Sequence, residues 1–328
     1  MVRVPFARLL GLALLTAASL FAAGCEEDVT DLHISGTPFT IYGVVNPTAD
    51  TQYVRVFPVT DTPAAHSPDP IQASARYVDL ESGTVYSARD SVVAFQEGRF
   101  GHVFWAAFRP RFDASYRIEV ESGDGVTSYA TVRTPPPSAI SELQPYTRFE
   151  PQARDRVPMV PLMVERTDGV LQQIVAVYHV EAHNIGRDFH VIPYDTAVQD
   201  VAGGWRVDVD LVRDYNAIYA IWQDEYRRHE ADLRERGVEC CRVEFYGLEL
   251  RAVVVDSNWV PPGGVYDPEL LVQPGTMDNV ENGFGFIGAG YEARSDVFVP
   301  RCLQYWAGYV FADNPCTGAD YCTYRGEC

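Results

Sequence analysis

The strongest constraint on this fold is the alternation of side chains in short runs along residues 38–134. In residues 53–59, for example, every second position belongs to one set and the positions between them to another. The two sets are Tyr53, Arg55, Phe57 and Val59, and Val54, Val56 and Pro58. Neighbouring side chains of a strand point to opposite faces of a sheet, so such runs indicate strands. Tight turns at residues 81–84 and 122–125 separate neighbouring runs. Seven or eight short strands with regular turns predict an immunoglobulin-like β-sandwich over residues 38–134.

A proline triplet marks the clearest boundary in the chain. Residues 135–138 read Pro-Pro-Pro-Ser, which is typical of a stiff, extended spacer between domains. A second β-rich domain is predicted for residues 139–301, with strands at residues 170–183 and 205–212. The fold class is therefore mainly β, with two β-rich domains in series.

The second domain contains one predicted helix, near residues 214–236. Large side chains recur there at helical spacing, and Gly237 is placed to end the helix. The side chains that give this periodicity are Ile218, Ile221, Trp222, Tyr226, His229 and Leu233.

Six cysteines fall in the last third of the chain, and most lie in a Cys-rich tail at residues 302–328. An even number of cysteines in an exported protein predicts three disulfides, which would staple this tail. A metal site is a weaker interpretation, because no C-x-x-C pair is present. The candidates are Cys240, Cys241, Cys302, Cys316, Cys322 and Cys328.

The N-terminal residues 1–24 have the pattern of a signal peptide. Two arginines precede a short apolar run, which is too short for a spanning helix and ends in small residues before Cys25. The sequence Ala-Ala-Gly-Cys resembles the lipobox of bacterial lipoproteins, whose cysteine is lipidated. We therefore expect Cys25 to carry acyl chains such as palmitate, followed by an acidic tether over residues 25–37. The alternative is an ordinary secreted protein with an incidental cysteine.

The formal net charge is −19, and the chain contains no lysine. Such an acidic field repels nucleic acid, so we expect no nucleic-acid partner. The lipid anchor predicts a membrane partner and a location in the cell envelope, at the outer membrane. The sequence leaves open whether the body faces the periplasm or the surface.

One segment has the spacing of a metal site. On a strand, His179, Glu181 and His183 would share one face, and two imidazoles with a carboxylate can bind zinc. His190 lies close enough in the sequence to supply a fourth ligand. The alternative is the polar, solvent-facing side of a sandwich strand, and this is the interpretation we favour, so no cofactor is expected.

Other apparent motifs favour structural roles. The stretch Gly283 to Gly290 lacks the following helix and the Lys-Ser/Thr pair of a phosphate loop, so it indicates close backbone packing. Acidic pairs such as Asp208 and Asp210, or Asp61 and Asp69, are expected by chance in a chain with 45 acidic residues. The chain also has no Gly-x-Ser-x-Gly elbow and no His-Glu-x-x-His helix, so no enzymatic activity is expected.

Several loose motifs follow one another along the chain: the lipidated cysteine, residues 29–32, 39–45, 75–80 and 115–120, the Pro135 boundary, residues 279–285 and the cysteine-bearing end. Their order resembles a known family, the lipoproteins described as domain of unknown function 4249. Residues 281–285 read Glu-Asn-Gly-Phe-Gly, which departs slightly from the Gly-Gly-Leu-Gly form of the family. The resemblance implies a surface lipoprotein, often encoded beside TonB-dependent outer-membrane receptors, with no assigned reaction.

These observations predict an outer-membrane lipoprotein that acts as a non-catalytic ligand-binding or accessory module of a TonB-dependent uptake system. The ligand is unknown. One alternative is a metal-dependent hydrolase that uses His179, Glu181 and His183. A second alternative is a purely structural surface lipoprotein, which no small ligand would stabilise.

Overall fold

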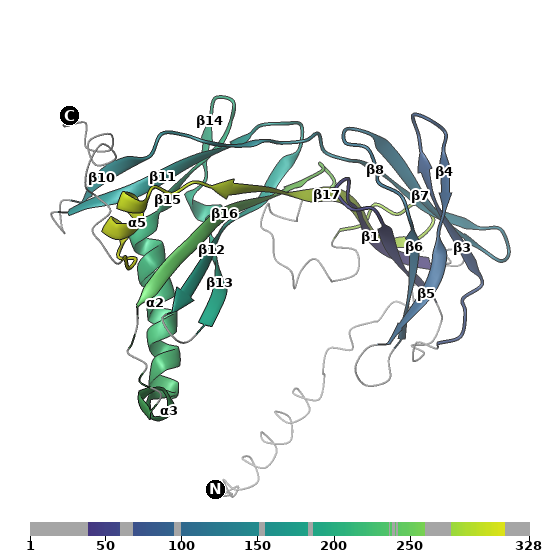
Figure 1. The fold of residues 1–328 in the computed structure, drawn as a ribbon. Coiled ribbons are helices and arrows are strands. Elements are labelled where there is room, and N and C mark those ends of the chain that lie inside the picture. The colour runs from purple at the N-terminus through teal and green to yellow at the C-terminus, as the bar shows by residue number, and fades with distance from the viewer. Residues whose placement is uncertain are drawn as a thin grey trace, which may run out of the picture. The chain divides into compact units, whose positions relative to one another are not determined.

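The computed structural model describes residues 39–59, 68–94, 100–150, 155–182, 186–235, 237, 240, 242–259 and 277–311. Within these residues the protein is mainly β, which confirms the predicted fold class (Figure 1). The predicted signal peptide, Cys25 and the tether lie outside the described residues.

The first β-rich half forms two sheets around one core. The strands β4, β3, β7 and β8 form one sheet, and β1, β2, β6 and β5 form part of an eight-stranded sheet. Ile41, Val56 and Ile118 are fully buried between them. The strand bounds are β1 (Phe39–Val45), β2 (Gln52–Pro58), β3 (Ala73–Asp79), β4 (Val85–Ser87), β5 (Arg89–Ala94), β6 (Phe100–Ala106), β7 (Ser115–Ser122) and β8 (Thr127–Arg133).

The second half places a separate core between two further groups of strands. A five-stranded sheet has the order β10-β11-β15-β14, with β9 paired to β11, and the eight-stranded sheet continues as β13-β12-β16-β17. The bounds are β9 (Ile140–Glu142), β10 (Tyr146–Glu150), β11 (Asp155–Glu165), β12 (Val170–Ala182), β13 (Gly186–Pro193), β14 (Gln199–Val201), β15 (Gly204–Asp210), β16 (Val243–Val255) and β17 (Phe284–Val297), with a 3-10 turn η2 (Asp195–Ala197).

Strand β17 belongs to both halves (Figure 1). Its first part, Phe284 to Ala289, pairs in parallel with β1, and its second part, Gly290 to Val297, pairs antiparallel with β16. Ile287 and Ala289 are buried in the first core, whereas Val297 is buried in the second. The segment predicted as the end of the second domain therefore also completes the N-terminal sandwich.

The glycine-rich stretch allows β17 to approach its neighbours closely, as predicted. Gly285 has a φ of +106°, and a Cβ at this position would clash with the carbonyl oxygen of Ile41. At Gly288 a Cβ would overlap the indole ring of Trp259. At position 285 only glycine can adopt the positive φ and also leave room for the Ile41 carbonyl.

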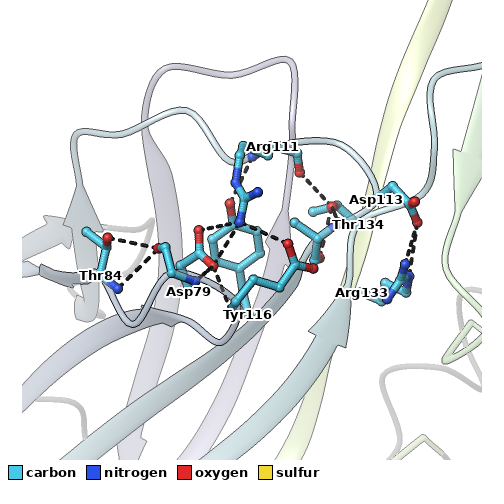
Figure 2. A network of polar contacts seen from close by, with 10 residues as sticks. Asp79, Thr84, Arg111, Asp113, Tyr116, Arg133 and Thr134 are labelled. Carbon is cyan, nitrogen blue, oxygen red and sulfur yellow. Dashed lines mark hydrogen bonds and ion pairs between the residues drawn. The ribbon is translucent and has the colours of Figure 1, made fainter.

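A polar network closes one end of the first sandwich (Figure 2). Asp79 is buried and accepts a hydrogen bond of 2.9 Å from Arg111 Nη2. Burial favours the neutral acid, but hydrogen bonds from the Ser82 backbone and from Arg111 hold the pKa of Asp79 below its usual value. Tyr116 Oη accepts from the Arg111 backbone at 2.9 Å, much as the tyrosine corner of immunoglobulin-like sandwiches fixes a connection.

The proline-rich segment 135–138 is held against β17. Tyr291 Oη donates to the Pro136 carbonyl at 2.9 Å and accepts from the Ser138 backbone at 2.6 Å. Thr134, just before it, is fully buried and donates to the Arg111 carbonyl at 2.6 Å. The predicted spacer is thus tied to the sheet on both sides of its prolines.

The described α-helices are α2 (Leu211–Arg228), α3 (Glu230–Glu235) and α5 (Arg301–Ala307). The single helix predicted near residues 214–236 is divided at His229, where φ is −118° and ψ is 18°. It also begins earlier than predicted, because Asp210 accepts a hydrogen bond from the Arg213 backbone at 2.9 Å and caps the helix. None of the described helices is both long and apolar enough to span a membrane.

The start of the predicted Cys-rich tail is helical and buried. Cys302 and Leu303 of α5 are at most 1% exposed, and Leu303 packs in the second core. Cys240 and Cys302 are both disulfide-bonded. Which cysteine each of them is bonded to is not given by the described residues. Cys241, Cys316, Cys322 and Cys328 lie outside the described residues, so the three-disulfide framework stays a prediction.

Asp256 is a buried carboxyl at the junction of the two halves. Its backbone N–H donates to Ala289 of β17 at 2.9 Å, and Asn258 Nδ2 reaches both Asp256 Oδ2 and the Thr131 carbonyl. Burial raises the pKa of Asp256 to about 7, although the backbone N–H of Ala289 and others favour the charged form. The folded protein therefore holds this proton up to nearly neutral pH.

We expect Gly285→Ala to lower the free energy of unfolding by more than about 2 kcal/mol, since the new Cβ meets the Ile41 carbonyl at an unfavourable φ. Gly83→Ala is the matched control, because Gly83 also has a positive φ but has open space around it. Its cost should be about 1 kcal/mol. Urea denaturation measures both values, and equal costs would contradict a steric role for Gly285.

Asp256→Asn should change the pH dependence of stability. The folded carboxyl keeps its proton to about pH 7, so its contribution to the free energy of unfolding falls as the pH rises from about 4 to 7. The variant should therefore be more stable than the native chain at pH 8, by up to about 4 kcal/mol, and similar at pH 4. Urea denaturation at the two pH values tests this, with the exposed Asp296→Asn as control. A difference that does not depend on pH would refute the assignment.

Candidate functional site

Helix α2 presents one buried face to the second core. Leu211, Asp214, Ile218 and Trp222 are its buried residues, and they recur every three or four positions. Three of them are apolar and pack in the second core, whereas Asp214 is a fully buried carboxylate. The helix is thus positioned by both apolar packing and a specific polar contact.

The Asp214 carboxylate joins α2 to the strands. It accepts hydrogen bonds from Tyr178 Oη of β12 at 2.7 Å, from Tyr194 Oη at 2.6 Å and from Arg213 Nη2 at 2.7 Å. Burial raises the pKa of Asp214 despite these hydrogen bonds, which favour the charged form. Because several elements donate to one carboxylate, this contact fixes where the rest of α2 runs along the sheet.

Further along the chain, α2 and β13 enclose a small pocket. Its volume is about 220 Å³, below the range typical of sites for drug-sized ligands. Figure 1 shows α2 running beside β12 and β13. The pocket is lined by Asp188, His190, Ile221, Trp222 and Glu225.

Two rings form the buried wall of this pocket. His190 is 8% exposed and Trp222 is 6% exposed, and their centroids lie 5.7 Å apart in an edge-to-face arrangement. In the described part of the chain, neither His190 Nε2 nor Trp222 Nε1 has a hydrogen-bond partner. Buried polar atoms are almost always paired, so two unpaired ring nitrogens at one pocket call for an explanation.

The charges around the rings are acidic. Burial lowers the pKa of His190, and the nearby Asp188 carboxylate offsets part of this effect. His190 is therefore neutral at pH 7. Glu225 lies 3.2 Å from both Arg228 Nη2 and His229 Nε2, whereas Asp188 pairs with no basic side chain among the described residues. The pocket thus combines neutral rings, an apolar side chain and two carboxylates.

The predicted metal ligands do not converge in the described structure. His179 and Glu181 lie on the outward face of β12, where Glu181 pairs with Arg187 at 2.8 Å and His179 Nε2 is 3.9 Å from Glu249. His190 is paired with Tyr178 in the ladder and therefore faces the opposite side of the sheet. It does not join His179 as a fourth ligand.

His183 lies outside the described residues, so the complete set His179, Glu181 and His183 stays a prediction. Within the ranges that the structure covers, no three His, Cys, Asp or Glu side chains are grouped closely enough to hold a metal ion. This includes Asp188, His190 and Glu225.

Asp208 and Asp210 line a second, more polar cavity of about 460 Å³ beside η2. Asp208 pairs with Arg206 at 2.9 Å, and Asp210 pairs with Arg148 at 2.9 Å and also caps α2. Both carboxylates therefore support the fold. Asp61, from the other acidic pair considered, lies outside the described residues.

Sequence reasoning did not bring the pocket residues together. The sequence predicts Ile221 and Trp222 as members of a helix and offers His190 as a metal ligand, but it indicates no role for Asp188 or Glu225. The available signals were the i, i+2 spacing of Asp188 and His190 on a strand and the i, i+3 spacing of Trp222 and Glu225 on a helix. Neither signal shows that the two elements meet.

No protein-family model and no curated protein matches this chain. The resemblance to the lipoproteins of domain of unknown function 4249 therefore stays a prediction.

The pKa of His190 should respond to its two neighbours in opposite directions. Trp222→Ala admits water to the ring and should raise this pKa toward the ordinary value, whereas Asp188→Asn removes a negative charge and should lower it further. A pH titration of the histidine ring protons by NMR measures both shifts, with His190→Gln used for assignment. Shifts of the same sign in both variants would contradict the described environment.

Proposed function

We propose that this chain is a lipid-anchored, non-catalytic ligand-binding or accessory module of a TonB-dependent uptake system at the outer membrane. The pattern of residues 1–25 and the order of the loose motifs along the chain support the anchor and the cellular setting. The pocket between α2 and β13 supports binding as the role of the folded body.

The observation that carries the proposal is a hollow with two buried rings in its wall. His190 and Trp222 are more than nine-tenths buried, and they lie beside a solvent-accessible pocket. Ligand sites are typically concave and lined by apolar and aromatic side chains with a few polar groups, and Asp188 and Glu225 supply such groups here.

The carboxylates described on the strands support the same role. Asp79, Glu181 and Asp208 each pair with an arginine at 2.9 Å or less. Such charge-assisted pairs hold strands and turns together. These three carboxylates thus serve the cohesion of the fold, whereas Asp188 at the α2–β13 pocket pairs with no basic side chain among the described residues.

Affinity purification from native outer membranes tests the proposal. The tagged full chain should co-purify with a β-barrel receptor in near-stoichiometric amount, as read by mass spectrometry. Recovery of the chain alone, under conditions that preserve known membrane complexes, would contradict the role as a receptor partner.

Cys25→Ser is the matched control for the anchor. The variant should leave the membrane fraction and lose incorporation of labelled palmitate, because the acylated sulfur is removed. If Cys25→Ser stays in the membrane to the same extent as the native chain, the lipid anchor at Cys25 is wrong.

A further inference from the structure

The α2–β13 pocket has walls of two kinds. Ile221 is 51% exposed and offers an apolar surface next to the Trp222 ring. The Asp188 and Glu225 carboxylates lie at the same pocket, one from the strand and one from the helix. A molecule that fits this arrangement has an apolar part and a positively charged part.

The two rings form the packing surface of the pocket. His190 Nε2 and Trp222 Nε1 are unpaired among the described residues and closed to solvent, so a ligand in the pocket lies against the rings rather than bonding to these atoms. Burial lowers the pKa of His190, so the ring does not compete with a cation by carrying charge of its own.

The electrostatic setting favours a positively charged ligand over an anion. The chain has a formal net charge of −19, which raises the local concentration of cations. Asp188 pairs with no described basic side chain, so its charge is available to the pocket. Glu225 is partly balanced by Arg228 and His229.

A bare metal ion fits less well than an organic cation. Divalent metals of the calcium and magnesium type prefer a shell made entirely of oxygen atoms. Here Ile221 and the Trp222 ring occupy much of the wall, and Asp188, His190 and Glu225 do not gather as a metal-binding group within the described chain. The apolar wall instead suits an alkyl chain.

We propose that the α2–β13 pocket binds a small alkylammonium group, with its nitrogen near Asp188 and Glu225 and its alkyl chain against Ile221 and Trp222. The proposal rests on the binding role proposed above and names the class of its ligand. A volume of about 220 Å³ limits the bound group to a short chain.

The test is a titration of the full chain in detergent with n-butylammonium chloride, followed through the indole N–H signals by NMR. Trp222→Phe identifies the signal of Trp222 among the five tryptophans. A saturable shift of that signal is expected. n-Butanol, a neutral molecule of similar shape, should bind at least about fivefold more weakly, because it lacks the charge.

Two matched variants separate a local from a general charge effect. Asp188→Asn should weaken n-butylammonium binding by about fivefold, while the exposed Asp232→Asn on α3 should leave the affinity within about twofold. Both variants remove one negative charge, but only Asp188 lines the pocket. Equal weakening by the two variants would overturn the assigned site.

The remaining outcomes distinguish this proposal from the proposed function. An unchanged Trp222 signal, or equal binding of n-butanol and n-butylammonium, overturns the ligand class. If the receptor is still recovered in the affinity purification, the role as a binding module stands and only the alkylammonium assignment fails.

Discussion

The structure depends on one strand that is shared by two cores. β17 supplies Ile287 and Ala289 to the first core and Val297 to the second, and it pairs with β1 in parallel and with β16 antiparallel. A strand can change partners in this way only if its backbone comes very close to its neighbours, and Gly285 meets that need. Removal of this strand would leave both cores incomplete.

The position of the pocket follows from a second constraint, the burial of Asp214. A carboxylate in an apolar core is stable only when it is fully hydrogen-bonded, and Tyr178, Tyr194 and Arg213 provide that environment. These contacts fix the first turn of α2 on the sheet. Because a helix is stiff, the same contacts also determine where Trp222, two turns further on, meets His190 of β13.

The sequence was informative where local rules decide the structure. Alternating side chains, the turn at Gly83 and the helical spacing of Ile218 and Trp222 correctly indicated a mainly β chain with a helix in its second half. The division of that helix at His229 was missed, because the helical periodicity continues through Leu233 and hides the change of backbone conformation.

Contacts between segments distant in the sequence were not predictable. Nothing in residues 284–297 indicates that the strand would pair with β1, which lies more than two hundred positions earlier. The sequence also did not show which side of the sheet His190 of β13 faces. The register of a strand decides which side chains face the core, and the register depends on the partner strand. The candidate site lies where two such elements meet, so its composition could be read only from the fold.

Every basic side chain with a fixed positive charge in this protein is an arginine, and this affects the charge of its surface. Arginine binds carboxylates through a planar, forked group, so pairs such as Arg111 with Asp79 and Arg213 with Asp214 combine charge with defined geometry. With 26 basic and 45 acidic residues, such pairs still leave a large excess of negative charge. The arginines of these pairs are held by particular carboxylates, so they do little to balance that excess at Asp188. This excess of negative charge therefore favours a cation at the pocket proposed above, where the Asp188 carboxylate lies beside the apolar surface of Ile221 and Trp222.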